Sequence, residues 1–302
     1  MPIKPFKDLS LVDDFMFSEV MRKPENIKPF LETLLEKRIQ RVVAIDKQKD
    51  LKDTYDAHGI RLDVYLEDEH NTKYDVEVQA RLHRKLEKRI RYYASGIDRH
   101  SLEVNADYEE LSDSFVIFIC VEDYFGAGLA VYERESHIKG VPEIPYEDGS
   151  HAYILNADFT RENGSPVVLD FLRYIRAGYK GEEFDISKSS YLQQIDEAVN
   201  EIKRDSGREM EYMTLAMKMM DERKEAFEQG EARGRAEGRA KGRAEGRAEG
   251  RAEGRAEGRA EGERSSQIKT IKRMLARGLS FEDISDMMGL GLDQVKELAE
   301  QE

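Results

Sequence analysis

The sequence predicts an α/β fold in which a mixed central sheet is flanked by helices. Two neighbouring segments alternate apolar and polar residues, at 60–67 (IRLDVYLE) and 73–79 (KYDVEVQ), and the polar turn between them favours an antiparallel hairpin. A third segment, 114–122 (SFVIFICVE), is continuously apolar, which is typical of a strand buried on both faces. Helical periodicity before and after these segments completes the α/β pattern.

The helices are predicted from apolar residues that recur every three or four positions. This spacing is clear over 24–37 and looser over 9–21, and it returns over 84–100 and 166–178. Weaker strands are expected near 129–134 and 151–156. Together these elements predict one sheet with helices on both sides of the hairpin.

Composition divides the chain into four regions. Residues 1–185 form the predicted α/β domain, and 186–230 form a helical extension with little proline or glycine. Residues 231–263 form a spacer that consists largely of R-A-E-G tetrads. Residues 264–302 have their own apolar periodicity and predict a small module that resembles a helix-turn-helix.

Net charge, cysteine content and the length of apolar runs indicate which binding partners and which cellular compartment to expect. The formal net charge of −14 argues against attraction of the whole molecule to nucleic acid, although a local basic patch stays compatible with it. The single cysteine, Cys120, excludes a disulfide within the chain and favours a reducing compartment. We find neither an apolar signal segment nor a run long enough to span a bilayer, so we expect a cytoplasmic protein with no membrane contact.

The predicted hairpin brings acidic side chains together. Alternation places Arg61, Asp63 and Tyr65 on one face of the first strand. Asp75, Glu77 and Gln79 share one face of the second strand, so Asp63 and Glu77 become neighbours. Two adjacent carboxylates repel each other unless a cation neutralises them, and oxygen ligands suit Mg²⁺ or Mn²⁺. Alternating charges also occur on sheet faces that are merely solvated, and spacing alone leaves that alternative open.

Several segments together resemble one known family. They are LVDDFMF (11–17), GIRLDVY (59–65), YDVEVQ (74–79), RIRYY (89–93) and FVIFIC (115–120). In this order they resemble the Rpn family of recombination-promoting nucleases, also labelled transposases, of the PD-(D/E)xK superfamily. The resemblance covers roughly the first 180 to 230 residues.

The resemblance implies a nuclease core and assigns roles to particular residues. Asp63 fills the first acidic position and Glu77 the second, and these two are the expected metal ligands. Gln79 stands at the third catalytic position, which is lysine in most of the superfamily, and a glutamine supplies no positive charge. Asp14 matches an N-terminal acid of the family, and an acid in the first turn of a helix is an equally good interpretation.

A basic segment directly follows the second strand of the hairpin. It is a candidate DNA-binding surface because it follows the expected catalytic strand and contrasts with the acidic remainder of the domain. A solvated helix face is the open alternative. The candidate DNA-binding residues are Arg81, Arg84, Lys85, Lys88, Arg89 and Arg91.

Neither the repeat nor the last segment predicts DNA reading. Glycine at every fourth position costs about 1 kcal/mol per residue in a helix, and like charges recur four residues apart. A spacer of variable length is therefore favoured, with a helix packed against a second helix as the alternative. The end of the C-terminal module is acidic, so we favour an interaction module, with a homodimer through the repeat or this module as a further expectation.

Two functions are compatible with these features. The first is a Mg²⁺-dependent DNA endonuclease, with Mn²⁺ as an alternative ion, linked to recombination or mobile elements. The second is a catalytically weak or inactive protein that keeps the nuclease fold for DNA binding or assembly. Gln79 and the acidic balance favour the second, and the residue pattern around Asp63 and Glu77 favours the first.

Overall fold

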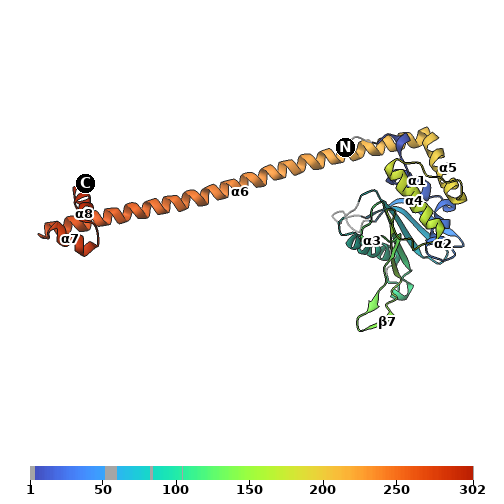
Figure 1. The fold of residues 1–302 in the computed structure, drawn as a ribbon, viewed down its shortest axis with the longest axis horizontal. Coiled ribbons are helices and arrows are strands. Elements are labelled where there is room, and N and C mark those ends of the chain that lie inside the picture. The colour runs from blue at the N-terminus through green and yellow to red at the C-terminus, as the bar shows by residue number, and fades with distance from the viewer. Residues whose placement is uncertain (1–3, 52–59, 82–83, 104, 302) are drawn as a thin grey trace. The chain divides into compact units, whose positions relative to one another are not determined.

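The computed structural model describes residues 4–51, 60–81, 84–103 and 105–301 (Figure 1). The chain forms two compact units, Met1–Lys218 and Met219–Glu302, and each is described by itself.

A six-stranded mixed sheet forms the centre of the first unit, with strand order β1-β2-β3-β4-β8-β5. β1, β2 and β3 form an antiparallel meander, β3, β4 and β8 are parallel, and β5 is antiparallel to β8. The α/β class with a mixed sheet is thereby confirmed. The strands are β1 (Val42–Leu51), β2 (Ile60–Asp68), β3 (Lys73–Gln79), β4 (Ser114–Cys120), β5 (Val131–Glu133) and β8 (Ser150–Asn156), while β6 (His137–Ile138) and β7 (Val141–Pro145) pair separately.

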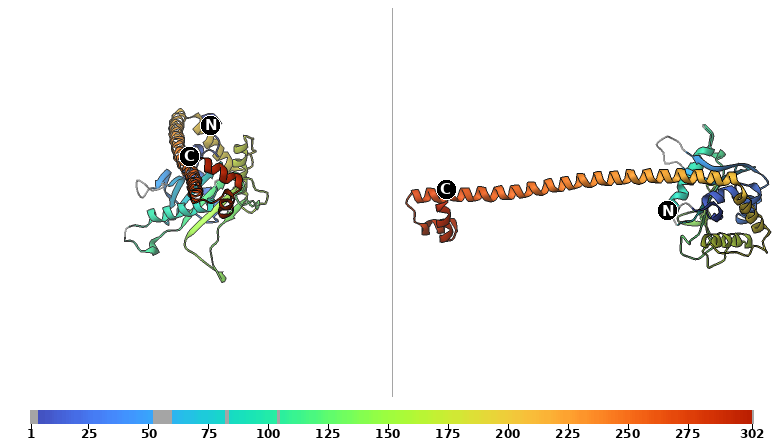
Figure 2. Two further views of the ribbon diagram at one scale, coloured as in Figure 1. Left: turned by 90° about the vertical axis from the view of Figure 1, so that its left-hand side faces the viewer. Right: turned by 90° about the horizontal axis from the view of Figure 1, so that it is seen from above.

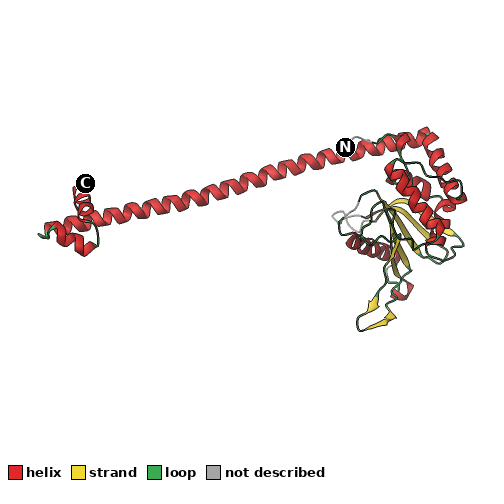
Figure 3. Ribbon diagram, viewed as in Figure 1, coloured by secondary structure: helices red, strands yellow, loops and turns green. Residues whose placement is uncertain are grey.

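Helices cover both faces of this sheet (Figure 3). One face carries α1 (Asp14–Met21), α2 (Pro24–Leu34), α4 (Pro166–Lys180) and α5 (Ser190–Arg204). The other face carries α3 (Leu86–Ser101), and two 3₁₀ turns, Phe6–Asp8 and Tyr108–Glu110, complete the unit.

The ends of several helices follow from local chemistry. The Ser165 side chain caps α4 by accepting a hydrogen bond from the Val168 amide, and Pro166 occupies the first helical position. Gly181, with φ of 70°, ends the same helix in the left-handed conformation. α3 begins at Leu86, because Lys85 before it has φ of 68°. The helix predicted from residue 84 therefore starts two residues later, and Arg84 and Lys85 lie outside it.

Both faces of the sheet are buried, and this decides the surroundings of the acidic residues. Side chains of β2 and β3 such as Val64, Val76 and Val78 pack into the larger core with α1 and α2. Phe118 of β4 packs instead with Ile90 and Tyr93 of α3. The face that alternation assigns to polar residues of β3 is thus covered by α3, and every residue of β3 is buried.

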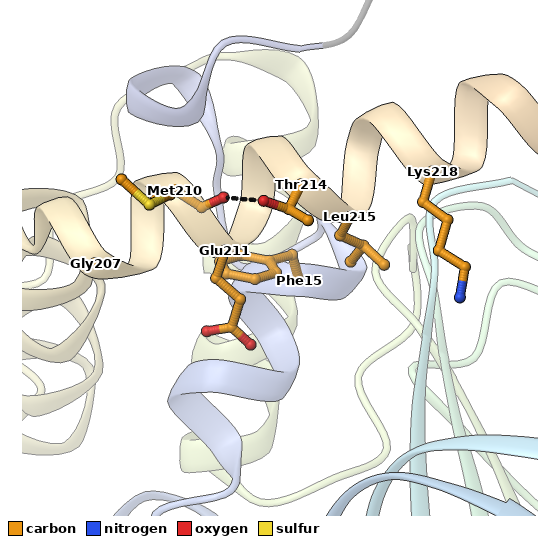
Figure 4. A pocket seen from close by; sticks show the side chains of 7 residues that line it. All are labelled: Phe15, Gly207, Met210, Glu211, Thr214, Leu215 and Lys218. Atoms are coloured by element: carbon orange, nitrogen blue, oxygen red, sulfur yellow. Dashed lines mark hydrogen bonds between the residues drawn. The ribbon is translucent and has the colours of Figure 1, made fainter.

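The first turns of α6 (Ser206–Ala276) complete the first unit. Tyr212 packs against Phe6 and Phe15, with ring centroids 5.8 and 5.3 Å apart. The buried Glu19 carboxylate lies 3.0 Å from Arg22 and 3.2 Å from Arg208. Beside these contacts, Phe15 of α1 and side chains of α6 line a pocket (Figure 4), whose floor is largely apolar.

The second unit consists of the rest of α6 together with α7 (Phe281–Met288) and α8 (Leu292–Glu300). The repeat, residues 235–262, is continuously helical (Figure 2), and its residues are exposed. Ser280 and Asp283 form a capping box at the start of α7, and Gly289 ends that helix with φ of 63°. Ile271, Ile284, Val295 and Leu298 form the core of the module.

None of the helices that the structure describes is both long and apolar enough to cross a lipid bilayer.

The small core of the second unit generates a testable prediction. Replacing Ile284, which is fully buried, with alanine should destabilise the packing of α7 and α8 by about 3 kcal/mol, because it removes buried methyl groups and leaves a cavity. Amide hydrogen exchange in residues 264–301 measures this directly. Met287→Ala on the same helix is the matched control, since Met287 is 69% exposed. Equal exchange rates in the two variants would contradict the assigned core.

Candidate active site

The acidic residues of the hairpin lie where the pairing of β2 with β3 ends. The two strands are in register from Glu67–Lys73 to Val64–Val76. At the next position, the Asp63 and Glu77 carboxylates accept the hydrogen bonds of backbone amides. The Asp63 amide donates to Glu77 Oε1 over 2.8 Å, and the Val78 amide donates to Asp63 Oδ2 over 3.4 Å. The structure therefore places Asp63 and Glu77 side by side.

The strand is distorted at the same point. Leu62 packs on the α3 side of the sheet together with Tyr65, whereas strict alternation would put these two residues on opposite faces. Strict alternation would also place Leu62 on the face of Val64 and Leu66, but those two residues pack in the other core. The carboxylates of Asp63 and Glu77 occupy the place at which regular pairing would otherwise continue.

Asp75 is a third carboxylate at this place, and the sequence pattern did not assign it to the site. Asp75 and Glu77 are both fully buried. Among the described residues, no amide, hydroxyl or guanidinium group donates a hydrogen bond to either oxygen of Asp75. The sequence did contain a clue, because alternation puts Asp75 on the face of Glu77. We refer to Asp63, Asp75 and Glu77 as the carboxylate cluster.

Burial and mutual repulsion hold the carboxylate cluster toward its protonated form. Desolvation raises the pKa of Asp63, and the nearby Glu77 and Asp14 carboxylates raise it further. Desolvation and Asp63 raise the pKa of Asp75 in the same way. Desolvation and Asp75 raise the pKa of Glu77. These shifts show that the cluster is unfavourable while its charges are not neutralised.

Arg89 of α3 is the cation that opposes these shifts. Its Nη2 donates to Glu77 Oε2 over 2.8 Å, and its Nη1 donates to Gln79 Oε1 over 2.7 Å. The positive charge lowers the pKa of all three carboxyls against the larger effect of burial. Arg89 was predicted to bind DNA as part of the basic segment. The structure turns its side chain, which is 28% exposed, toward Glu77 on the sheet, and its role in DNA binding stays a prediction.

Gln79 has a defined orientation at the end of β3. Its Nε2 donates to the Val78 carbonyl over 3.0 Å, while its Oε1 accepts the bond from Arg89. The amide thus presents its acceptor to Arg89. In this arrangement Gln79 anchors the guanidinium rather than donating a hydrogen bond toward the carboxylate cluster.

Asp14 comes close enough to interact with the carboxylate cluster. It is the first residue of α1, with Asp13 at the N-cap position, so it is an acid of the first helical turn. Its charge also raises the pKa of Asp63 and of Glu77. Both interpretations of Asp14 from the sequence are therefore compatible with its position.

Comparison with known families supports a nuclease centre at this place. Residues 11–138 match the family model described as PD-(D/E)XK nuclease family transposase. This part of the chain, less than half of its length, is similar to that family. The match is to the family as a whole, so the closer resemblance to the Rpn nucleases stays a prediction from the sequence motifs. No curated protein and no solved structure matches the chain.

The segment that matches the family model contains every residue of the candidate site described above. It runs from the start of α1 through β1–β4 and α3, and so includes Asp14, the carboxylate cluster, Gln79 and Arg89.

The donor set of the domain fits a divalent cation. Members of the carboxylate cluster supply hard oxygen atoms, and Asp75 adds two buried oxygens that accept no hydrogen bond from an amide, hydroxyl or guanidinium group of the described residues. No group of three or more such side chains converges in ion-binding geometry in the part of the chain that is described. Mg²⁺ is commonly held by one or two carboxylates, with water and phosphate oxygens completing the shell. Asp63 and Glu77 are enough for such a site.

The other predicted DNA-binding residues lie around the start of α3. Lys88 and Arg91 are exposed on its first turns, and Arg84 and Lys85 are exposed in the turn before it. Arg81 is exposed at the end of β3. This turn is also tied to the loop after β4, because the Leu86 amide donates to the Tyr124 hydroxyl over 3.0 Å.

The buried Asp75 generates a prediction about stability. Its pKa is raised on folding, so the folded protein binds a proton more tightly than the unfolded chain, and stability is lost as pH rises above the ordinary value of 3.8. Such a group costs up to about 1.4 kcal/mol per pH unit in this range. In EDTA, Asp75→Asn should be about 1–2 kcal/mol more stable than the unaltered protein at pH 8, with a smaller difference at pH 5.

Urea denaturation at the two pH values measures this difference. Asp8→Asn is the matched control, because Asp8 is exposed on the first 3₁₀ turn. If the free energy of unfolding of Asp75→Asn changes between pH 5 and pH 8 as much as that of the unaltered protein, Asp75 does not carry the buried charge.

Proposed function

We propose that the protein is a metal-dependent DNA endonuclease that hydrolyses phosphodiester bonds at the carboxylate cluster, with Mg²⁺ or Mn²⁺ as cofactor. The observation that supports the proposal is the adjacent pair Asp63–Glu77, of which Glu77 is fully buried, at the end of the β2–β3 pairing and within the segment that matches the nuclease family. A folded protein has little reason to bury adjacent carboxylates unless a cation or a substrate compensates for them.

Each residue has a distinct part in the proposed reaction. Asp63 and Glu77 hold the metal ion, which supplies Lewis-acid activation of the phosphodiester and of the attacking water. The backbone contacts of both carboxylates fix their orientation before substrate arrives. Gln79 holds Arg89 in place, and Asp14 adds negative charge at the edge of the site. The covering helix α3 limits the access of bulk water to Asp75 and Glu77.

Exposed basic residues around the start of α3 support DNA as substrate. Lys85, Lys88 and Arg91 are exposed on the helix whose Arg89 contacts the site, or directly before it, so phosphates bound there would pass close to the carboxylate cluster. The net charge of −14 implies that the attraction is local to this surface.

The cellular context of the proposed activity follows from the family. The transposase description supports a role in recombination or mobile elements, and the single buried cysteine favours the cytoplasm. The exposed repeat helix supports a homodimer, because a lone helix with glycine at every fourth position is marginal, and a second helix would compensate.

A second function has one observation in its favour. Gln79 replaces the lysine that most of the superfamily carries, and its amide is engaged with Arg89 and the Val78 carbonyl. A protein that keeps the fold and binds DNA without cutting it would tolerate this substitution.

Cleavage of supercoiled plasmid separates the two functions. The unaltered protein should nick DNA with Mg²⁺ or Mn²⁺ and not in EDTA. Asp63→Asn and Glu77→Gln, which keep the side-chain shape, should each lower the rate by at least about 100-fold, because each removes a metal ligand. Glu109→Gln, an exposed acid on the second 3₁₀ turn, is the control. Nicking that persists in both site variants would refute the endonuclease assignment, and DNA binding without any nicking would favour the second function.

The basic surface generates an independent prediction. Lys88→Ala with Arg91→Ala should weaken DNA binding at all sequences alike, and should reduce the slope of log K against log salt by about 0.9 for each phosphate that is no longer neutralised. Fluorescence anisotropy in Ca²⁺ at several salt concentrations measures the slope. Lys139→Ala, an exposed lysine in the β6–β7 turn, is the control. A slope that matches that of the unaltered protein would exclude this surface.

A further inference from the structure

Arg89 lies among carboxylates whose negative charge a neighbouring cation would compensate. Its guanidinium contacts Glu77 and Gln79 on β3, and its charge acts on Asp63 and Asp75 as well. Three carboxylates around one guanidinium leave an excess of negative charge. A divalent ion could therefore bind beside Arg89 without the total charge becoming positive.

Aromatic side chains hold the Arg89 guanidinium in place. The Tyr93 hydroxyl accepts bonds from Nε over 2.9 Å and from Nη2 over 2.7 Å. The rings of Tyr93 and Phe118 lie 4.9 and 5.0 Å from the guanidinium carbon, within cation–π range. Arg89 therefore has a fixed position relative to the carboxylate cluster, which an exposed arginine on a helix surface would not have.

One N–H group of the Arg89 guanidinium is available to a substrate. Of the five N–H groups of the guanidinium, the contacts with Glu77, Gln79 and Tyr93 use four among the described residues. The remaining N–H is on Nη1. The Arg89 side chain is 28% exposed, so it keeps partial contact with solvent. A planar, permanently charged group is well suited to a phosphate oxygen that gains negative charge.

Gln79 makes this arrangement possible. A lysine at position 79 would bring an ammonium group against the guanidinium and repel it, whereas the glutamine carbonyl accepts its hydrogen bond. Position 79 on β3 thus carries no positive charge. The charge lies instead on Arg89 of α3, within hydrogen-bond distance of Gln79.

We infer that Arg89 is the charge-stabilising residue of the nuclease centre, which uses its guanidinium, anchored by Gln79 and Tyr93, to neutralise the negative charge that develops on the phosphodiester during hydrolysis. The inference rests on the proposed function. It assigns to Arg89 a role inside the centre, distinct from that of the exposed basic residues of the DNA-binding surface.

Two substitutions of similar size separate charge from packing. Arg89→Lys keeps the positive charge and Arg89→Gln removes it, while both shorten the side chain and remove the paired hydrogen bonds to Tyr93. Arg99→Gln, an exposed arginine farther along α3, is the matched control, and circular dichroism verifies the fold of each variant. Plasmid nicking with saturating Mn²⁺ should fall by about 100-fold or more in Arg89→Gln and should remain at least about tenfold higher in Arg89→Lys.

The same variants are measured by calorimetric titration with Mn²⁺ in the absence of DNA. Loss of a positive charge beside the ligands should tighten Mn²⁺ binding about tenfold in Arg89→Gln and leave it nearly unchanged in Arg89→Lys. Equal nicking rates in the two variants, or a loss that weaker DNA binding fully explains, would overturn the inference.

The two proposals can fail separately. If the unaltered protein cleaves no DNA under any metal condition, the proposed function fails while the Mn²⁺ titration still tests Arg89. Tighter binding in Arg89→Gln alone would then support the charge assignment, and identical affinities in the two variants would overturn it.

Discussion

The meeting of three neighbouring carboxylates in a sheet, two of them fully buried, is the constraint on which the rest of the site depends. Asp75 and Glu77 are inaccessible to solvent, and Asp63 meets Glu77 where the backbone pairing of β2 with β3 ends. Charges in such an environment are strongly unfavourable unless they are compensated. Arg89, the backbone amides and the proposed metal ion each compensate for this negative charge.

Helix α3 connects this constraint to the surface of the molecule. It begins directly after the left-handed Lys85, and this start sets which side chains face the sheet. Arg89 and Tyr93 point to the carboxylate cluster, while Lys88 and Arg91 stay exposed on the same turns. One short helix thus carries both the compensating charge of the centre and the surface proposed to bind DNA.

Much of the fold could be predicted from the sequence because strand alternation is a local property. It predicted the hairpin of β2 and β3 and the continuous buried strand β4. The residue pattern did not predict strand β1, because its apolar run Val42–Ile45 is only four residues long and mostly charged residues follow it.

The candidate site was predictable only in part, because part of it depends on packing between distant segments. Alternation alone brought Asp63 beside Glu77, but it could not show that α3 covers this face and buries Asp75. Helical periodicity likewise gave the spacing of the basic residues but not the rotation of the helix against the sheet. Arg89 was therefore grouped with exposed residues, although it contacts Glu77 and Gln79.

The location of the metal ion tests the central claim most directly. A crystal structure of the full chain grown with Mn²⁺, with anomalous scattering recorded at the manganese edge, gives that location without reference to activity. The account predicts an anomalous peak within coordination distance of the Asp63 and Glu77 carboxylates, with Arg89 still held by Gln79. A carboxylate cluster that stays free of manganese while its side chains are ordered, or a peak coordinated by other residues, would contradict it.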